Sequence, residues 1–152
     1  MIIREALVSD VPQMQIVRIA VKENILSNTD LVTDKDCIDY ITNRGKGWIY
    51  EIEDELVGFS IADLRQESIW ALFVHPLHEK KGIGKQLHDI MMDWYFAQGK
   101  QKAWLSTDPN TRAAAFYRLR GWEEVGIKEN GEIIFHLTRD KWTSITIENS
   151  PK

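Results

Sequence analysis

One stretch of the chain, FVHPLHEKKGIGKQLHDIM at residues 73–91, most restricts how the chain can fold. The nearly continuous apolar run SIWALFV at residues 68–74 is typical of a central strand covered on both faces, and Pro76 ends it. After the loop, apolar residues recur at helical spacing: Ile83, Leu87, Ile90, Met91 and Trp94. The stretch therefore predicts a strand, a short loop, and a long helix that ends near Gly99.

The rest of the chain supplies further helices and strands around this unit. Before it, the sequence predicts a strand at residues 2–3, a helix that is capped by Ser9 or Asp10 and reaches Ile25, a helix at 33–43, and a hairpin at 47–65. After it come a strand at 102–107, a helix within 108–122, and a hairpin at 122–140 with an Asn-Gly turn. In the last helix, four residues are expected to face inward: Ala113, Phe116, Tyr117 and Leu119. This order predicts a single α/β domain over residues 1–142 and a C-terminal tail at 143–152.

Composition limits the class of protein. The chain has 152 residues and a net charge of −4, without a segregated basic stripe, so we expect one soluble domain that does not bind nucleic acid. The one cysteine, Cys37, excludes an internal disulfide and favours a reducing compartment. The sequence shows neither a signal peptide nor a membrane span, so we expect a cytoplasmic protein, as a monomer or homodimer, with no membrane partner.

Several catalytic motifs are excluded by their spelling around the loop. A dinucleotide fingerprint requires glycine where the chain has Leu87. An NTPase phosphate loop requires glycine where the chain has Glu79, and serine or threonine where it has Gln86. A zinc-protease pattern beginning at His78 would require its second histidine where the chain has Gly82. No serine nucleophile elbow is present either, and we expect no metal.

The loop itself has the chemistry of an anion site. Glycines at 82 and 84 allow the backbone to approach a ligand closely, and the first amides of a helix have no carbonyl partners. The positive end of the helix dipole then favours a bound anion, typically a phosphate. Lys80, Lys81 and Lys85 add charge at the rim. The alternative is that the glycines only shape a tight turn and the lysines are solvated.

Two spaced motifs decide between these alternatives, because together they resemble the GNAT superfamily of N-acetyltransferases. In that family a central strand ends in a Val-x-Pro-like segment, and Gln/Arg-x-x-Gly-x-Gly/Ala then opens a long helix. This chain has LFVHPLHEKKGIGKQL at residues 72–87. The family often continues with Asn, a short gap, Ala-x-x-Phe-Tyr and Gly-Phe, and this chain has NTRAAAFYRLRGW at 110–122. The chain departs from the family pattern at Glu79, where Gln or Arg is usual, and at Trp122, where Phe is usual.

The resemblance covers about residues 1–140 and implies an α/β (α+β) fold. The expected fold is a mixed, mostly antiparallel sheet of about six to seven strands, flanked by about four helices. The implied reaction is the transfer of an acetyl group from acetyl-CoA to a primary amine of a small molecule or peptide, by direct attack in a ternary complex.

The resemblance also implies which residues bind acetyl-CoA. Backbone groups of the strand would hold the pantetheine arm and polarise the thioester, namely those of Leu72, Phe73 and Val74. The loop and helix start would hold the pyrophosphate, namely Glu79, Lys80, Lys81, Gly82, Ile83, Gly84 and Lys85. Asn110 matches the side chain that holds the pantetheine arm in the family.

The catalytic groups are less completely implied. Tyr117 matches the tyrosine proposed in many members as general acid for the coenzyme A thiolate, and Phe116 is assigned to packing. Many members place a general base, a glutamate, on the central strand, where this chain has Trp70. The remaining candidates are Glu67 or Asp108 acting through water, or an ordered water alone. We expect His75 and His78 to be structural.

The amine acceptor is not identified by the sequence. In the family, the first two helices, the loop between them at residues 23–33, and the last hairpin wall its pocket. An acidic group, Asp30, Asp34 and Asp36, would attract a cationic amine or merely be solvated, and Trp48 and Trp70 would line the pocket or fill the core. Two other hypotheses remain: an acyl-CoA-sensing module of the same fold without turnover, and a different nucleotide-binding enzyme.

Overall fold

The computed structural model describes residues 1–22 and 32–148, and the chain divides into two compact units, Met1–Asp93 and Trp94–Lys152. Each unit is described separately below. Most of the expected acceptor loop at residues 23–33, together with Ile25 and Asp30, lies outside the described residues.

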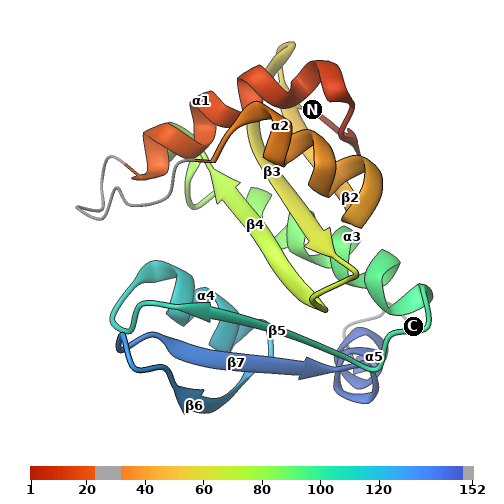
Figure 1. The fold of residues 1–152 in the computed structure, drawn as a ribbon, viewed down its shortest axis with the longest axis vertical. Helices are drawn as coiled ribbons and strands as arrows, with labels where there is room; N and C mark the ends of the chain where they lie inside the picture. The colour runs from red at the N-terminus through yellow and green to blue at the C-terminus, as the bar shows by residue number, and fades with distance from the viewer. Residues whose placement is uncertain (23–31, 149–152) are drawn as a thin grey trace. The chain divides into compact units, whose positions relative to one another are not determined.

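The first unit is built on four antiparallel strands in the order β1-β2-β3-β4. The strands are β1 (Ile2–Glu5), β2 (Gly45–Ile52), β3 (Glu55–Asp63) and β4 (Ser68–Val74). Its helices are α1 (Val11–Lys22), α2 (Asp34–Asp39) and the beginning of α3 (Ile83–Ala97). Shorter helical pieces are η1 (Val8–Asp10), η2 (Tyr40–Arg44) and η3 (Pro76–His78). Figure 1 shows α1 and α2 together along one side of β3 and β4.

The core beneath α1 and α2 follows from strand alternation. Phe59 and Ile61 of β3 lie two residues apart, so their side chains share one face of the strand. Both point into this core and are almost fully buried. The other buried members come from α1, α2 and the neighbouring strands: Val11, Met14, Val17, Cys37, Ile49, Leu56 and Ala71. This cluster fixes α1 and α2 on the face of β3 toward which Phe59 and Ile61 point.

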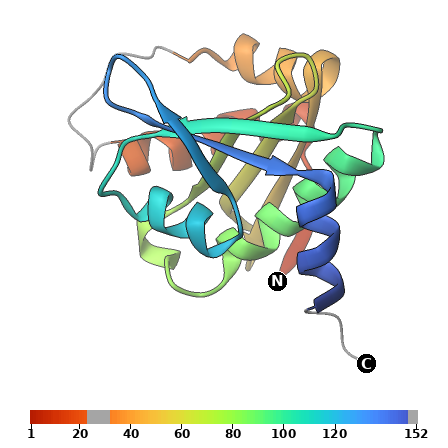
Figure 2. The same cartoon turned by 90° about the horizontal axis from the view of Figure 1, so that it is seen from below.

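Helix α3 packs on the opposite face of β3, where Gly58 permits a close approach. A Cβ atom at Gly58 would lie 3.1 Å from Leu87 Cδ1 and 3.4 Å from Ile83 Cγ2. Two residues along, the Ser60 hydroxyl donates to the Leu87 carbonyl at 3.2 Å. These contacts hold the first two turns of α3 against β3, and they therefore position the loop before the helix (Figure 2).

Strand β4 contains a bulge at Trp70. Ile61 pairs with Ala71 and Ala62 pairs with Ile69, which leaves Trp70 between them without a partner in β3. An extra residue in one strand breaks the alternation of side chains between the two faces. As a result Trp70 and its neighbour Ala71 both pack against the cluster beneath α1 and α2.

The second unit has three antiparallel strands in the order β5-β7-β6. Its elements are β5 (Lys102–Thr107), α4 (Arg112–Leu119), β6 (Glu123–Ile127), β7 (Ile133–Thr138) and α5 (Arg139–Glu148). Figure 2 shows α5 continuing from the end of β7. The sequence predicts a tail from residue 143, but the structure has a helix through Glu148, in which Trp142 is 3% exposed and Ile145 packs on Gly121.

The predicted fold class is confirmed. The described residues form seven strands, mostly antiparallel, and five α-helices rather than about four. Within α4, the prediction that Ala113 and Leu119 face inward is wrong: both are exposed, and Ala114 and Tyr117 are the buried residues. The helix begins after Thr111, whose hydroxyl accepts from the Ala114 amide. Ala114 and Tyr117 lie three residues apart and share one face of the helix, and this is the face that packs inward. In the described part of the chain, no helix is long and apolar enough to cross a membrane.

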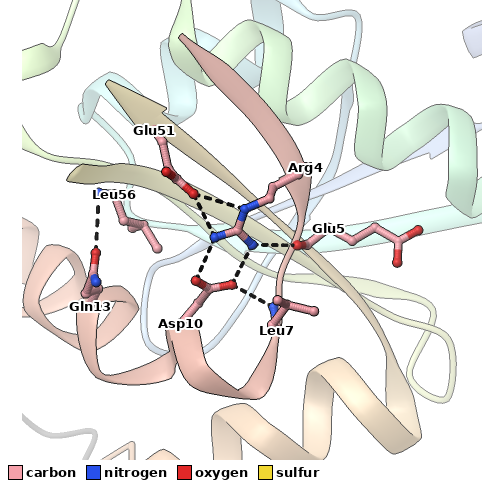
Figure 3. A network of polar contacts seen from close by, with 7 residues as sticks. All are labelled: Arg4, Glu5, Leu7, Asp10, Gln13, Glu51 and Leu56. Atoms are coloured by element: carbon pink, nitrogen blue, oxygen red, sulfur yellow. Dashed lines mark hydrogen bonds and ion pairs between the residues drawn. The ribbon is translucent and has the colours of Figure 1, made fainter. Parts of the chain in front are cut away.

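Arg4 joins β1, β2 and the turn that begins α1 (Figure 3). Its guanidinium donates to both oxygens of Asp10, at 2.8 and 2.9 Å, and to Glu51 Oε1 at 2.9 Å. Asp10 Oδ2 also accepts from the Leu7 amide at 2.7 Å, which closes the turn. The hydrogen bonds from Arg4 are the main reason that the pKa of Asp10 lies below its usual value. The ion pair therefore links the first strand to the first helix.

We predict that Asp10→Asn destabilises the protein by about 2 kcal/mol at pH 7, because a partly buried charged pair is lost. The folded-state pKa of Asp10 is depressed, so its stabilisation is complete above about pH 4 and is lost as the pH falls through the folded-state value. Urea unfolding of both proteins at pH 7 and in steps down to pH 3 measures this. The control Glu123→Gln, in an exposed pair with Lys141, should cost less than about 0.5 kcal/mol. A difference between Asp10→Asn and wild type that stays constant with pH would contradict the prediction.

Candidate functional site

The loop between β4 and α3 is fixed to the sheet by His75. The His75 amide donates to the Val57 carbonyl at 2.8 Å, and its Nδ1 accepts from the Leu77 amide at 3.1 Å, capping η3. His78 Nδ1 lies 3.2 Å from Lys81 Nζ, and since an ammonium only donates, this nitrogen accepts. Both histidines therefore have contacts within this loop.

The end of the loop has an unusual backbone. Lys80 and Gly82 have positive φ angles of 63° and 80°, whereas Lys81 between them does not. Such alternation of backbone hand turns successive amides toward one concave side, an arrangement that binds anions. A Cβ at Gly82 would meet no atom within 4 Å, so glycine is required there by the backbone angle and not by crowding.

Helix α3 opens directly on this turn. Its first backbone hydrogen bond runs from the Gln86 amide to the Gly82 carbonyl at 3.2 Å, so the amides of Ile83, Gly84 and Lys85 precede the helical ladder. The helix spans 15 residues, and the positive end of its dipole lies at these amides. Lys80, Lys81 and Lys85 are exposed around them. This end of α3 has the geometry and charge to bind a phosphate group.

Glu79 stands at the start of the loop. Its amide donates to the Pro76 carbonyl at 3.5 Å, and its side chain is half-buried. The amides nearest the helix mouth therefore begin with Lys80, one residue later than the motif predicts.

The residues expected to hold the pantetheine arm lie on the last part of β4. Leu72, Phe73 and Val74 pair with Ser60, Phe59 and Gly58 of β3, and all three are half-buried. The rings of Phe73 and Phe59 lie 5.6 Å apart between centroids, which anchors this part of the strand to the core. The expected thioester position on β4 is therefore followed directly in the chain by the loop at residues 75–82, which we call the anion loop.

Glu67, the candidate base, lies just before this strand. It occupies the turn between β3 and β4 with a φ of 56° and is exposed. This turn precedes Ser68, whereas the anion loop follows Val74, so Glu67 and the loop lie at opposite ends of β4.

The bulged Trp70 belongs to a column of stacked groups. Its ring stacks on Tyr40, with centroids 3.8 Å apart and planes 10° from parallel. The Arg44 guanidinium lies over the Tyr40 ring at 4.5 Å and donates to Asp63 Oδ2 at 2.8 Å. Asp63 is 1% exposed and also accepts from the Arg65 amide at 2.9 Å. Sequence reasoning missed this column, because a one-residue bulge leaves no periodic signal.

Tyr117 and Asn110 lie in the second unit. Tyr117 is 7% exposed among aromatic rings, with centroids 5.3 Å from Phe116, 5.5 Å from Trp122 and 6.3 Å from Phe135. Burial raises the pKa of its phenol well above the usual range, so it remains protonated at neutral pH and can donate. Asn110 is exposed with a φ of 62° just before the N-cap Thr111, a conformation that asparagine tolerates.

One further pair lies on α3. His88 has a fully buried side chain whose Nδ1 lies 2.9 Å from Asp89 Oδ1, and this pair was not expected from the sequence. Among residues 1–22 and 32–148, no group of three or more His, Cys, Asp or Glu side chains is placed to hold a metal ion.

The chain matches one family model, described as the acetyltransferase (GNAT) family, over residues 12–122. This match covers more than half of the chain. No curated protein matches the chain significantly.

Solved structures of acetyltransferases have the same fold. PaiA N-acetyltransferase from Thermoplasma acidophilum, in complex with coenzyme A, has a TM-score of 0.78 at 15% identity, covering 90% of this chain and 98% of that one. Ribosomal-protein-alanine N-acetyltransferase from Brucella melitensis has a TM-score of 0.77 at 20% identity, covering 91% and 99%. An aminoglycoside 6'-N-acetyltransferase complexed with coenzyme A has a TM-score of 0.73 at 18% identity, covering 91% and 97%.

The left-handed turn before α3 leads to a stability prediction. Gly82→Ala should destabilise the protein by about 1 kcal/mol, because a Cβ is strained at a φ of 80° even where space is open. Gly126→Ala is the matched control: its Cβ would make an ordinary 3.9 Å contact in an extended strand, so this change should stabilise by about 0.5 kcal/mol. Thermal unfolding of both variants measures the two signs, and a Gly82→Ala protein as stable as wild type would contradict the geometry.

Proposed function

Because the chain belongs to the GNAT acetyltransferase family, we propose that it transfers an acetyl group from acetyl-CoA to a primary amine of a small molecule or peptide. The observation that carries the proposal is the turn through Lys80 and Gly82, followed by the helix-opening amides of residues 83–85. The neighbours named above as coenzyme A complexes support the same cosubstrate. The single buried cysteine fits a cytoplasmic location, which we also propose.

In this proposal each part of the site binds one part of acetyl-CoA. The amides of residues 80–85 bind the pyrophosphate, and the exposed lysines 80, 81 and 85 screen its charge. Backbone groups of Leu72, Phe73 and Val74 hold the pantetheine arm, and an amide of Phe73 or Val74 polarises the thioester carbonyl. Asn110 also contacts the arm. Glu79 turns its carboxylate away from the pyrophosphate.

The proposed reaction is a direct attack within a ternary complex. The neutral amine nitrogen attacks the thioester carbon and forms a C–N bond, and the oxyanion is stabilised by the β4 amide. Collapse of this intermediate breaks the C–S bond, and the electron pair leaves with sulfur. Tyr117 donates its proton to the thiolate. The amine nitrogen releases a proton to solvent, and Tyr117 takes a proton back from solvent.

A second candidate function is supported by Trp70. A strand without a carboxylate beside the thioester is compatible with a module that binds acyl-CoA and senses it without turnover. The two functions differ in one assay, the release of free thiol from acetyl-CoA in the presence of amines.

Replacement of Gly84, the second residue of α3, tests the cofactor site. We expect wild type to bind acetyl-CoA in isothermal titration, with no comparable binding of NAD or ATP. Gly84→Val should weaken binding on the order of 100-fold, because loss of the close backbone approach removes charge-assisted hydrogen bonds that together contribute about 3 kcal/mol. Gly126→Val, on an exposed strand of the other unit, is the control and should bind like wild type. Unchanged affinity in Gly84→Val would place the pyrophosphate elsewhere, and no binding at millimolar concentration would reject the cosubstrate.

Removal of the Tyr117 hydroxyl tests the acid. Tyr117→Phe should lower kcat by on the order of 100-fold or more, with little change in acetyl-CoA affinity, because the thiolate then leaves unprotonated. Tyr95→Phe is a matched control, since it removes another buried hydroxyl of the same unit, one that donates to the Lys102 carbonyl at 2.7 Å. Tyr95→Phe should lower stability but not kcat. Equal kcat for wild type and Tyr117→Phe across a panel of amines would reject the role of Tyr117.

A further inference from the structure

The turn of the β6–β7 hairpin contains Asn130 followed by Gly131, and Asn130 is the one asparagine of the chain that precedes a glycine. This pair favours a tight turn, which is the role that the sequence predicts for it. It also favours a chemical change, spontaneous deamidation, because glycine has no side chain to hinder attack by its backbone nitrogen on the asparagine side chain. The contacts around the turn determine how fast this reaction proceeds.

Deamidation needs water and no other reactant. The Gly131 backbone nitrogen loses its proton to solvent and attacks Asn130 Cγ, so a new C–N bond forms. The bond from Cγ to Nδ2 then breaks, and Nδ2 leaves as ammonia with a proton taken from solvent. Water opens the cyclic imide at one or the other of its carbonyl carbons, and the product is aspartate or isoaspartate.

Both ends of the Asn130 side-chain amide are held by Glu132. The Glu132 backbone amide donates to Asn130 Oδ1 at 3.1 Å, and Asn130 Nδ2 donates to Glu132 Oε1 at 3.1 Å. A backbone N–H only donates and a carboxylate only accepts, so these contacts fix the orientation of the Asn130 amide. Attack by the Gly131 nitrogen requires the side chain to turn Cγ toward that nitrogen, and the two hydrogen bonds resist this rotation.

The attacking nitrogen is held as well. The Gly131 amide donates to the Lys128 carbonyl at 2.9 Å, and the Lys128 amide donates to the Glu132 carbonyl at 2.8 Å, which closes the hairpin. Gly131 has a φ of 90°, a left-handed conformation that favours glycine. The nitrogen attacks only after it has lost the proton that it donates to Lys128, so this hydrogen bond must also break. In the folded hairpin, both reacting groups are therefore engaged.

The Glu132 carboxylate has further contacts, so its position does not depend on Asn130 alone. Ser106 Oγ of β5 donates to Glu132 Oε1 at 3.3 Å, and Lys128 Nζ lies 3.7 Å from the same oxygen. Lys128 Nζ also lies over the Trp104 ring, 5.6 Å from its centroid. We call Glu132 and its three side-chain partners, Asn130, Lys128 and Ser106, the hairpin clamp. The clamp joins the turn to β5.

We propose that Asn130 is a site of spontaneous deamidation, and that Glu132 restrains the reaction while the hairpin is folded. The product ends this restraint. Aspartate at position 130 replaces the Nδ2 donor, which lies 3.1 Å from Glu132 Oε1, by a carboxylate oxygen, and the two negative charges repel each other. Isoaspartate also adds a carbon to the backbone of the tight turn. Because water does not reverse the hydrolysis, the modification loosens the hairpin permanently.

The sizes of the expected effects follow from the number of contacts. One hydrogen bond of ordinary net strength changes an equilibrium about fivefold. Three hydrogen bonds restrain the reacting groups, and the Glu132 side chain supplies one of them. Removal of this side chain should therefore speed the reaction about fivefold. Complete unfolding removes all of these hydrogen bonds and should speed it by on the order of 100-fold.

Peptide mass spectrometry on wild type and two Glu132 variants tests the proposal. The proteins are incubated at mildly alkaline pH, folded in buffer or unfolded in guanidinium chloride, and trypsin then releases residues 129–139 for analysis. Folded wild type should react on the order of 100-fold more slowly than unfolded wild type. Folded Glu132→Ala should react about fivefold faster than folded wild type, whereas Glu132→Gln, which keeps an acceptor oxygen, should stay within about twofold. The unfolded proteins should all react at one rate.

Two controls accompany this experiment. Ser106→Ala removes a contact of the clamp that does not touch Asn130, so its folded rate should lie within about twofold of wild type. Asn110 precedes a threonine, whose branched side chain hinders attack, so its peptide at residues 103–112 should react much more slowly in the same digest.

The outcomes separate the parts of the proposal. Absence of deamidation at Asn130 in unfolded wild type would overturn the assignment of the site. Equal rates in folded wild type and folded Glu132→Ala would overturn the restraint by Glu132. If circular dichroism shows that Glu132→Ala does not fold, the wild-type comparison still decides, because equal rates in its folded and unfolded forms would overturn the restraint.

A variant that carries the product tests the consequence. Asn130→Asp should shift the unfolding equilibrium in urea about fivefold toward the unfolded state at neutral pH, because a hydrogen bond becomes a repulsion. Asn110→Asp makes the same change of charge at an exposed position and should not destabilise the protein. An Asn130→Asp protein as stable as wild type would overturn the loosening of the hairpin.

Discussion

The amides that open α3 have no helical carbonyls to bind, and the proposed chemistry depends on where these amides point. Their position is set by packing some distance away. Gly58 has no side chain, so Leu87 and Ile83 lie directly on β3, and Ser60 holds the Leu87 carbonyl. His75 then ties the loop to Val57 of the same strand. A rigid helix end and a fixed loop thus hold a set of donors before any ligand arrives, which reduces the ordering cost of binding.

The bulge in β4 places Trp70 in the column of stacked groups. The bulge turns Trp70 onto the same face as Ala71, where its ring stacks on Tyr40 of η2 in a column that ends in an ion pair, Arg44 and Asp63. A buried pair of this kind is costly to break, so the column is a structural support and not a reservoir of catalytic protons. The strand that binds the thioester in our proposal is therefore supported on this face by groups that bind one another.

Much of the fold was predictable, because strand alternation, helical spacing and turn residues each leave a local pattern. The loop before α3 was predictable for the same reason: Pro76 restricts the backbone, and Gly82 and Gly84 permit backbone angles that other residues avoid. The inward face of α4 was not, since positions 113 and 114 are both alanine and only packing decides which of them is buried. Helix α5 was missed because Trp142 is the one fully buried residue of this helix, which is too few to show a period. The Trp70 column joins residues far apart in the sequence, and only the folded structure brings them together.

The most direct test of the central claim is a crystal structure of the protein with coenzyme A. Our account predicts pyrophosphate oxygens at hydrogen-bond distance, about 2.9 Å, from backbone nitrogens within residues 80–85. It also predicts the pantetheine arm along Leu72, Phe73 and Val74. Coenzyme A bound with its pyrophosphate held only by lysine side chains, or bound away from the start of α3, would contradict it.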